Sequence, residues 1–369
     1  MTSSDANFVS NTPKYQVFVR VTGQADNIGD SLLRRGLIRA LRAQGDLHLL
    51  VRALPESYVD GLGVQSEDAL YTEEGEWLRA AKKAGRFGRV AFVMNAGEFQ
   101  LNRGYAIQYL RYLPAILRAR RSGGFAAQLG AGIRSDALRW KPIIQLVLRS
   151  MDRVGWRDAE SRDALGLGGV MPDWGFDEGS PAAWLEGQGI ARARPWLSVS
   201  MRGDRPFPSD QWFDLVSALA AQHGLRPRIV VQVASDTKRA LEIGIRLNAE
   251  VIALQGSLHS QQETAVRAQY QDSSVVVSDR LHALVVGVTE GAIPLALVDG
   301  GSRKIAKHFA VVGATEVVVN SDKASANGAI VQLDVSDSSR RRYVSLVTDA
   351  RQVIQEIADS LSDWEKASL

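Results

Sequence analysis

Residues 15–41 read YQVFVRVTGQADNIGDSLLRRGLIRAL, and this stretch decides the fold class. Its first part, Tyr15 to Val21, is mostly apolar and has the length of one buried strand. A turn-rich segment follows, and apolar residues then recur at helical spacing, at Leu33, Leu37, Ala40 and Leu41. The order strand, loop, helix is the repeating unit of α/β proteins with parallel strands.

The same alternation continues along the chain. In the first half, strands are predicted over residues 89–95, 125–129 and 154–157, and a helix over 105–120. Residues 172–195 are rich in Gly, Pro and isolated Trp, which predicts a linker. The second half repeats the pattern, with strands predicted over residues 196–201, 228–233, 251–254, 274–278 and 293–298 and helices over 209–223, 236–248, 261–271 and 282–289.

These two series predict two domains, because 369 residues exceed what one hydrophobic core usually supports. We expect an α/β fold in which two Rossmann-like domains, residues 1–180 and 181–369, face a cleft. The second domain ends in a predicted long helix with one apolar face, formed by Tyr343, Val347, Ala350, Ile354, Ile357 and Leu361. This face requires a partner, either on the second domain or back across the first.

Composition excludes several classes of protein. The chain has no Cys, and its five His residues form no pair with ligand spacing, so no metal is expected. The net charge of +3 is small, and Arg118, Arg120 and Arg121 fit the solvated end of a helix, so no nucleic-acid partner is expected. Residues 1–15 lack the features of a secretory signal, and no apolar run has the length of a membrane span, which predicts a cytoplasmic protein.

Polar residues gather at four predicted strand ends, where open α/β sheets bind ligands. The first is Asn27-Ile28-Gly29-Asp30, whose glycine and helix start suit an anion, although Asn27 or Asp30 also fits a simple helix cap. The second is Asp279-Arg280-Leu281-His282, which puts a guanidinium for oxyanions beside an imidazole that can carry a proton. Alternatively, Arg280 pairs with a carboxylate and His282 packs as a neutral ring.

The other two strand ends add cations. Gly300-Gly301-Ser302-Arg303-Lys304 combines glycines, a hydroxyl and two positive charges at a helix start, which suits phosphate, whereas surface Arg-Lys pairs are common without a function. Arg157 ends a predicted strand in Gly155-Trp156-Arg157-Asp158, and a local pair with Asp158 is the alternative there.

In their order along the chain, these segments resemble the polysaccharide pyruvyl transferase family over about residues 15–320. The resemblance rests on Asn27-Ile28-Gly29-Asp30, Gly130-Ala131-Gly132-Ile133, Trp156-Arg157-Asp158 with Ser161, Ser200-Met201-Arg202, Ser278-Asp279-Arg280-Leu281-His282-Ala283 and Gly291-Ala292-Ile293-Pro294. Two segments of the first domain depart from the family pattern. Asn95-Ala96-Gly97-Glu98 replaces a run of glycines, and Arg134-Ser135 replaces Gly-Pro.

The resemblance implies a fold similar to that of GT-B glycosyltransferases. It also implies transfer of the enolpyruvyl group of phosphoenolpyruvate to a sugar of a cell-surface polysaccharide or its precursor, which forms a pyruvate ketal and releases phosphate. Phosphoenolpyruvate is then a co-substrate, and no cofactor is expected. The implied acceptor is a glycan or a lipid-linked saccharide, which is compatible with peripheral association at a membrane.

The family's site residues are carried over to the matching positions. The donor is expected to meet Arg280, Leu281 and His282, with Arg157, Arg303 and Lys304 holding its carboxylate or phosphate. His282 is the candidate general acid, and His282 or Asp30 the candidate base. The acceptor side or its loops are expected to include Asn27, Gly29, Glu98 and Arg202.

Two other functions fit parts of the sequence. A nucleotide-sugar glycosyltransferase with the same type of fold is favoured by Glu290, which precedes Ile293-Pro294 where an acidic residue would hold a donor ribose. Arg280 and His282 argue against it. A glycan-binding scaffold without enzymatic activity would instead stack sugar rings on tryptophans, of which the sequence offers Trp156, Trp174, Trp184 and Trp196.

Overall fold

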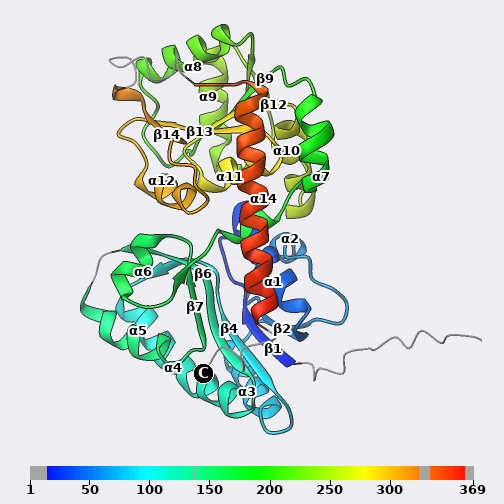
Figure 1. Cartoon of the computed structure of the whole chain (residues 1–369), viewed down its shortest axis with the longest axis vertical. Helices are drawn as coiled ribbons and strands as arrows, with labels where there is room; N and C mark the ends of the chain where they lie inside the picture. The colour runs from blue at the N-terminus through cyan, green and yellow to red at the C-terminus, as the bar shows by residue number, and fades with distance from the viewer. Residues whose placement is uncertain (1–14, 136–137, 324–332, 362–369) are drawn as a thin grey trace, which may run out of the picture.

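The computed structural model describes residues 15–135, 138–323 and 333–361. Two α/β halves lie one beyond the other, and a long helix, α14 (Asp337–Ser360), runs along both (Figure 1). Residues 1–14, which carry most of the sequence argument on a secretory signal, lie outside the described residues.

The first half is built on a parallel sheet of eight strands in the order β3-β2-β1-β4-β6-β7-β8, with β5 paired to β6. The strands are β1 (Tyr15–Arg20), β2 (Gly45–Leu50), β3 (Ala69–Tyr71), β4 (Val90–Met94), β5 (Gly97–Gln100), β6 (Phe125–Ser135), β7 (Arg153–Trp156) and β8 (Gly169–Val170). The α-helices are α1 (Ile28–Arg42), α2 (Glu56–Asp60), α3 (Glu74–Ala84), α4 (Arg103–Arg121), α5 (Lys141–Leu148) and α6 (Ala159–Leu165), and a 3₁₀ turn, η1 (Leu138–Trp140), precedes α5.

The second half has a parallel sheet of six strands in the order β11-β10-β9-β12-β13-β14. The strands are β9 (Trp196–Ser200), β10 (Arg226–Val230), β11 (Glu250–Ile252), β12 (Ser273–Ser278), β13 (Ile293–Val298) and β14 (Val318–Asn320). The helices are α8 (Asp210–Gln222), η4 (Ala234–Asp236), α9 (Thr237–Leu247), α10 (His259–Gln271), α11 (Leu281–Thr289) and α12 (Arg303–Ala310). Three short elements join the halves, namely η2 (Trp174–Asp177), α7 (Ala182–Trp184) and η3 (Leu185–Gly189).

Both sheets therefore have the strand order of a Rossmann fold, and the predicted α/β class with two parallel-sheet domains is confirmed. The order reverses between β1 and β4 in the first sheet and between β9 and β12 in the second. Loops that leave neighbouring strands in opposite directions open a crevice at such a point, which is where ligands of open α/β sheets bind.

The glycine motif at residues 130–133 differs from the prediction. It was expected to follow a strand, but β6 continues through it to Ser135, and β5 pairs with the extension. The backbone at Gly130 has φ +76°, and a methyl group there would lie 2.6 Å from the Trp174 ring. Gly130 thus gives the strand an irregular step that makes room for Trp174.

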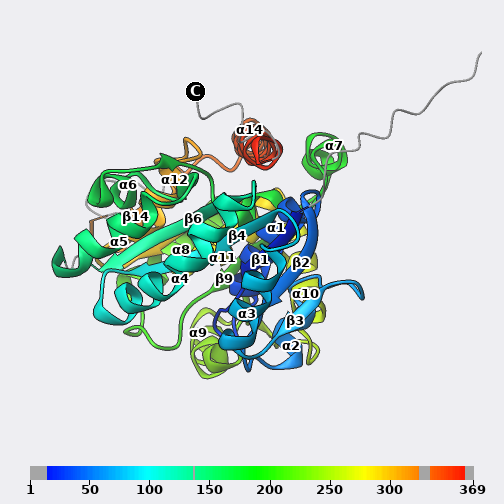
Figure 2. The same ribbon diagram turned by 90° about the horizontal axis from the view of Figure 1, so that it is seen from below.

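The sequence left open which domain the apolar face of the C-terminal helix packs against. In the structure α14 contacts both, through α11 in the second half and α1 in the first. Gln44 Nε2 donates to the Ala358 carbonyl at 3.3 Å, which ties the end of α14 to the first half. Arg351 donates to the carbonyls of Phe176, Ser180 and Glu178 at 3.0, 2.8 and 2.7 Å. Seen end-on in Figure 2, α14 lies on the outside of the molecule.

Among the helices that the structure describes, none combines the length and the apolar character that crossing a membrane would require.

Candidate active site between the two sheets

Strand-end loops of both sheets meet between the two halves. The first sheet contributes Asp30 after β1, Arg157 after β7 and Asp173 after β8. The second contributes His282, at the start of α11 after β12, and α12, which follows β13. Direct ion pairs cross the boundary, including Lys304 to Glu98 at 2.6 Å and Lys307 to Asp158 at 3.2 Å.

Asp173 joins several of these groups. Its carboxylate accepts a hydrogen bond from Arg157 Nη1 at 3.0 Å, and His282 Nε2 lies 3.8 Å from the same oxygen. Burial alone would raise the pKa of the Asp173 carboxyl, but the neighbouring His282 and the positive charge of Arg157 hold it well below its ordinary value. Asp173 is therefore a buried carboxylate held between an arginine and a histidine.

His282 packs directly on the backbone of α1. A methyl group at Gly29 would lie 2.5 Å from His282 Nδ1, so only a glycine leaves room for the ring. Gly29 and the whole first turn of α1 are held by Asn27, whose side chain accepts a hydrogen bond from the Gly29 amide at 3.1 Å and caps the helix.

Asp30 lies beside this contact. It pairs with Arg34 at 3.0 Å and accepts a hydrogen bond from the Gln24 amide at 2.8 Å. Burial raises the pKa of Asp30, but the charge of Arg34, the Gln24 amide and the charge of His282 together hold it below its ordinary value. Asp30 is thus a stabilised carboxylate close to the imidazole of His282.

His308 belongs to the same cluster, although sequence reasoning did not select it. Its Nδ1 lies 2.7 Å from the Lys304 carbonyl, and since a carbonyl only accepts, Nδ1 carries the proton. Burial and the charge of Arg157 hold the pKa of His308 well below its ordinary value, against the opposing charge of Asp173. The imidazole is therefore neutral, with its lone pair on Nε2.

Three buried nitrogen atoms of this cluster have no hydrogen-bond partner among the described residues: Arg157 Nε, His282 Nε2 and His308 Nε2. Arg157 and His308 are each only 2% exposed. Buried polar groups are nearly always paired, so three unsatisfied atoms around one carboxylate indicate a place where a polar ligand completes the hydrogen bonding.

A second group of charges surrounds Arg280. Its Nε donates to Asp236 Oδ2 at 2.7 Å, and the other oxygen of Asp236 accepts the Gly203 amide at 2.7 Å. Arg202 pairs with Asp204 at 2.6 Å, and the Asp204 pKa falls to about 2, because of that hydrogen bond first and the charges of Arg202 and Arg280 after it. The Leu281 side chain is buried, so only its backbone can reach a ligand.

Lys304 links the two groups electrostatically. Burial lowers the pKa of its ammonium, as do the positive charges of Arg157 and Arg202, while its partner Glu98 opposes the shift. Burial would raise the pKa of Glu98, but the charges of Lys304, Arg134 and Arg157 hold it below its ordinary value.

Arg303 stands apart from the predicted set. Its side chain is 82% exposed and its Nε contacts Glu160 at 2.9 Å, so it is not brought to the cluster around Asp173.

Residues that a nucleotide-sugar glycosyltransferase or a glycan-binding scaffold would use are buried in the structure. Glu290 is 1% exposed and accepts hydrogen bonds from Arg267 at 2.6 Å and Gln271 at 2.8 Å. Trp156 and Trp174 are fully buried, so neither ring can stack on a sugar.

Several solved structures share this architecture. HepE from Anabaena in complex with UDP has 12% sequence identity and a TM-score of 0.59, and the match covers 95% of this chain and 100% of that one. A putative UDP-N-acetylglucosamine 2-epimerase from Listeria monocytogenes has 11% identity and a TM-score of 0.56, with 96% and 98% covered. At such identities the likeness concerns the fold alone. A search of curated proteins gave no match.

The chain thus has a GT-B-type fold, with a charged, histidine-containing centre between its two Rossmann-like halves. The model of the polysaccharide pyruvyl transferase family matches residues 27–292, which is most of the chain. The chain belongs to this family.

Proposed function

We propose that this enzyme transfers the enolpyruvyl group of phosphoenolpyruvate to two hydroxyls of a sugar in a cell-surface polysaccharide or its precursor. The product is a pyruvate ketal, and phosphate is released. Family membership supports the reaction class. The observation that carries the donor assignment is the set of unpaired buried nitrogens of Arg157, His282 and His308 around Asp173.

Phosphoenolpyruvate fits this environment because it carries a carboxylate and a phosphate on a frame with little apolar surface. Such a ligand requires several cations from different directions. We assign this role to Arg157, Arg280 and Lys304, which come from three different strand ends. We keep Arg303 as an outer contact that requires a change of its pairing with Glu160.

The proposed reaction forms two C–O bonds at the central carbon of the donor, the first by addition and the second by substitution of phosphate. In the first, His282 protonates the methylene carbon, which becomes a methyl group, and a sugar hydroxyl adds to the central carbon and loses its proton. In the second, another hydroxyl of the same sugar displaces phosphate and completes the ketal. We propose no resident cofactor or metal, with phosphoenolpyruvate as the co-substrate and its phosphate as the leaving group.

A base must take the proton of the attacking hydroxyl. His282 can do so after it has given up its own proton, and Asp30 is a second candidate, although its ion pair with Arg34 weakens its basicity. We add His308 as a third, because its neutral ring keeps a buried lone pair on Nε2. We group Asn27, Gly29, Glu98 and Arg202 with the acceptor side and its loops.

The related structures with UDP raise the question of a nucleotide sugar as donor. The engagement of Glu290 by Arg267 and Gln271 argues against it, since a carboxylate with those partners is not available to a ribose. Phosphoenolpyruvate is a cytoplasmic metabolite, so we place the reaction there, with a glycan or lipid-linked saccharide as acceptor.

The test measures phosphate release from phosphoenolpyruvate with a panel of small glycans, together with thermal shifts by phosphoenolpyruvate, UDP and GDP. We expect phosphate release when phosphoenolpyruvate and an accepted glycan are both present. We also expect phosphoenolpyruvate, but neither UDP nor GDP, to raise the unfolding temperature. His282→Asn should reduce turnover by about 10²–10⁴-fold, as removal of a positioned acid does. His223→Asn, which alters a histidine at the end of α8, should retain the turnover of the unaltered protein. Stabilisation by a nucleotide alone, or full turnover of His282→Asn, would reject the proposal.

A further inference from the structure

The surface formed by α3 and α4 concentrates positive charge. Residues 74–121, which span both helices, contain ten Lys and Arg but three acidic residues, Glu74, Glu76 and Glu98, although the net charge of the whole chain is only +3. Glu98 does not offset this charge locally, because it pairs with Lys304 of the second half. The rest of the chain is therefore net negative, and the molecule has a strong charge asymmetry.

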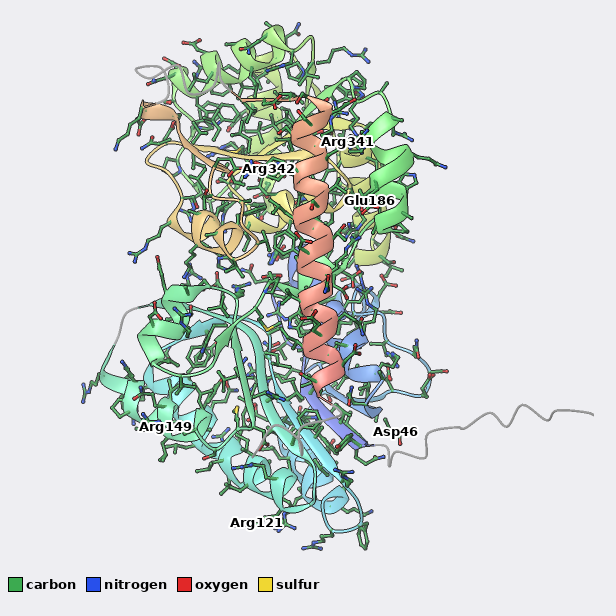
Figure 3. All side chains as sticks on the ribbon, in the orientation of Figure 1. Asp46, Arg121, Arg149, Glu186, Arg341 and Arg342 are labelled. Carbon is green, nitrogen blue, oxygen red and sulfur yellow. The ribbon has the colours of Figure 1, made fainter. Side chains whose placement is uncertain are left out.

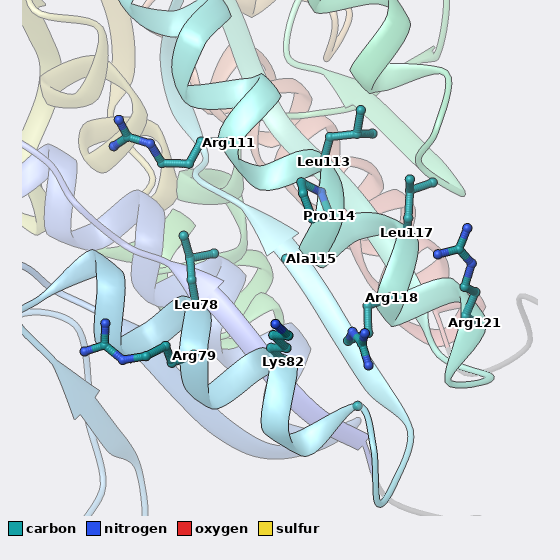
Figure 4. Close-up of a pocket in the computed structure, with 11 residues that line it drawn as sticks. Leu78, Arg79, Lys82, Arg111, Leu113, Pro114, Ala115, Leu117, Arg118 and Arg121 are labelled. Atoms are coloured by element: carbon teal, nitrogen blue, oxygen red, sulfur yellow. The ribbon is translucent and has the colours of Figure 1, made fainter.

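A pocket of about 650 Å³ lies between α3 and α4 on this surface. Cations and aliphatic side chains alternate around it, with Arg79, Lys82, Arg111, Arg118 and Arg121 beside Leu78, Leu113, Pro114, Ala115 and Leu117 (Figure 4). Arg79 and Arg111 have only loose ion pairs, 4.0 Å to Glu76 and 3.6 Å to Glu74. Within the described part of the chain, Lys82, Arg118 and Arg121 have no carboxylate within salt-bridge distance.

An exposed aromatic residue stands at the edge of the same surface. Phe87 is 83% exposed in the loop after α3, next to Arg86. This loop lies against α4, since a methyl group at Gly85 would be 3.0 Å from Arg118 Cγ. Ile107 and Leu110 of α4 are also exposed, by 45% and 41%.

Helix dipoles explain part of this arrangement, because cations in the last turns of α3 and α4 stabilise the negative helix ends. They do not explain Arg79 and Arg111, which lie away from those ends, or the exposure of Phe87. Cations that surround an aliphatic pocket match the phosphates and the upper acyl chains of a lipid layer. A nucleic acid would use the cations but would gain nothing from the aliphatic lining.

We propose that the α3–α4 surface docks on an anionic phospholipid bilayer. Arg121 lies at the end of the first half that faces away from the second half (Figure 3). The strand-end loops of the candidate active site lie toward the second half, so docking through α3 and α4 leaves the site uncovered. Of the Arg118, Arg120 and Arg121 cluster, which the sequence suggests is a solvated helix end, Arg120 pairs with Asp152 at 2.8 Å, and docking gives Arg118 and Arg121 an anionic partner.

The test is co-flotation of the full chain with vesicles of phosphatidylcholine alone or with phosphatidylglycerol added. We expect binding only to the anionic vesicles, and its loss in 1 M NaCl, where the Debye length is about 3 Å. Lys82→Glu/Arg118→Glu should weaken partitioning by at least about 30-fold, since each cation near the surface contributes a factor of about five. Phe87→Ser, at an exposed loop position, should also weaken it without affecting the fold.

The matched control is Lys238→Glu/Arg341→Glu, which changes the net charge equally at two exposed sites of the second half. It should bind vesicles like the unaltered protein, and both double variants should keep phosphate release with a soluble acceptor. Absence of binding to anionic vesicles, or equal weakening by the two double variants, would overturn the proposal. Binding of duplex DNA or RNA without vesicle binding would overturn it in favour of a nucleic acid.

Discussion

Gly29 gives the sharpest residue-level test of how His282 is positioned. Gly29→Ala places a methyl group 2.5 Å from Nδ1 in the present geometry, so the imidazole must move. A misplacement of about 1 Å in a reacting group can cost roughly 100-fold in rate, and we expect a loss of that order in phosphate release. The helix itself should persist, because alanine favours helix over glycine.

Gly187→Ala is the control for this substitution, since a methyl group at Gly187 meets no atom within 4 Å. Its turnover should match that of the unaltered protein. Unchanged turnover of Gly29→Ala would show that the ring position is not important for the reaction.

His308 makes a prediction on pH. Its pKa lies well below the ordinary 6.5 in the folded protein, so below pH 6.5 the unfolded chain binds the proton and the folded protein does not. The contribution of the neutral His308 ring to the free energy of unfolding is therefore fully present above pH 6.5. Below pH 6.5 the free energy of unfolding falls by about 1.4 kcal/mol per pH unit because of this group. We expect His308→Gln to lose this dependence, so its stability curve should approach that of the unaltered protein in acid.

Urea unfolding at pH 5.0, 6.0 and 7.5 measures this difference. Gln222→Asn, at an exposed position of α8 that carries no titratable group, should run parallel to the unaltered protein. Parallel curves for His308→Gln as well would contradict a buried, neutral His308 and its candidacy as a base.

Of the five residues that meet around Asp173, the sequence pointed to three and missed two. His282, Arg157 and Asp30 were accessible because they sit next to strand ends that periodicity predicts. Asp173 was not accessible, because it lies in residues 172–195, which composition predicts to be a linker. The strand before it, β8, has only two residues. His308 was missed as a single polar residue in a helix, and only its contact with the Lys304 carbonyl and its proximity to Arg157 reveal its environment.

Among elements, the buried parallel strands were the most predictable. Strands β12 (Ser273–Ser278) and β13 (Ile293–Val298) are buried along their whole length, and the sequence shows this as the apolar runs Val275–Val277 and Ile293–Val298. The opposite holds for β2 (Gly45–Leu50), which was not predicted. It contains His48, which stacks on Phe18 with ring centroids 4.2 Å apart and contacts Gln16 at 2.8 Å, and its polar side chains obscure the strand pattern.

Helix α14 shows a limit of another kind. Its apolar face is evident in the sequence, but the partner of that face is not, because periodicity says nothing of which surface an element meets. In the structure the same face packs on both halves. Arg351 donates to the carbonyls of Phe176, Glu178 and Ser180, which lie in the joining segment, residues 174–189 between the two halves. The helix thereby fixes the joining segment to both sheets.

At the scale of the whole molecule, a buried ion-pair network holds the halves together. Arg35 of α1 contacts Glu178 of the joining segment at 2.8 Å and Glu263 of α10 at 2.7 Å. Glu263 continues to Arg267 at 2.7 Å, and Arg267 to Glu290 at 2.6 Å. The network runs from the first half to the end of α11, the helix that begins with the Arg280–His282 segment.

Arg35→Met should therefore destabilise the protein and loosen the halves from each other. It leaves two carboxylates of the network without one of their cations, and breaking a buried pair in this way costs about 3–5 kcal/mol. Arg39→Met, one turn further along α1, is the matched control, because Arg39 is 51% exposed and its pairs with Asp177 and Glu178 should be worth no more than about 1 kcal/mol. Calorimetry should give a lower midpoint or two separate transitions for Arg35→Met and little change for Arg39→Met. An equal effect of the two substitutions would mean that the halves are held by apolar packing alone, and that the network contributes no more than a surface ion pair does.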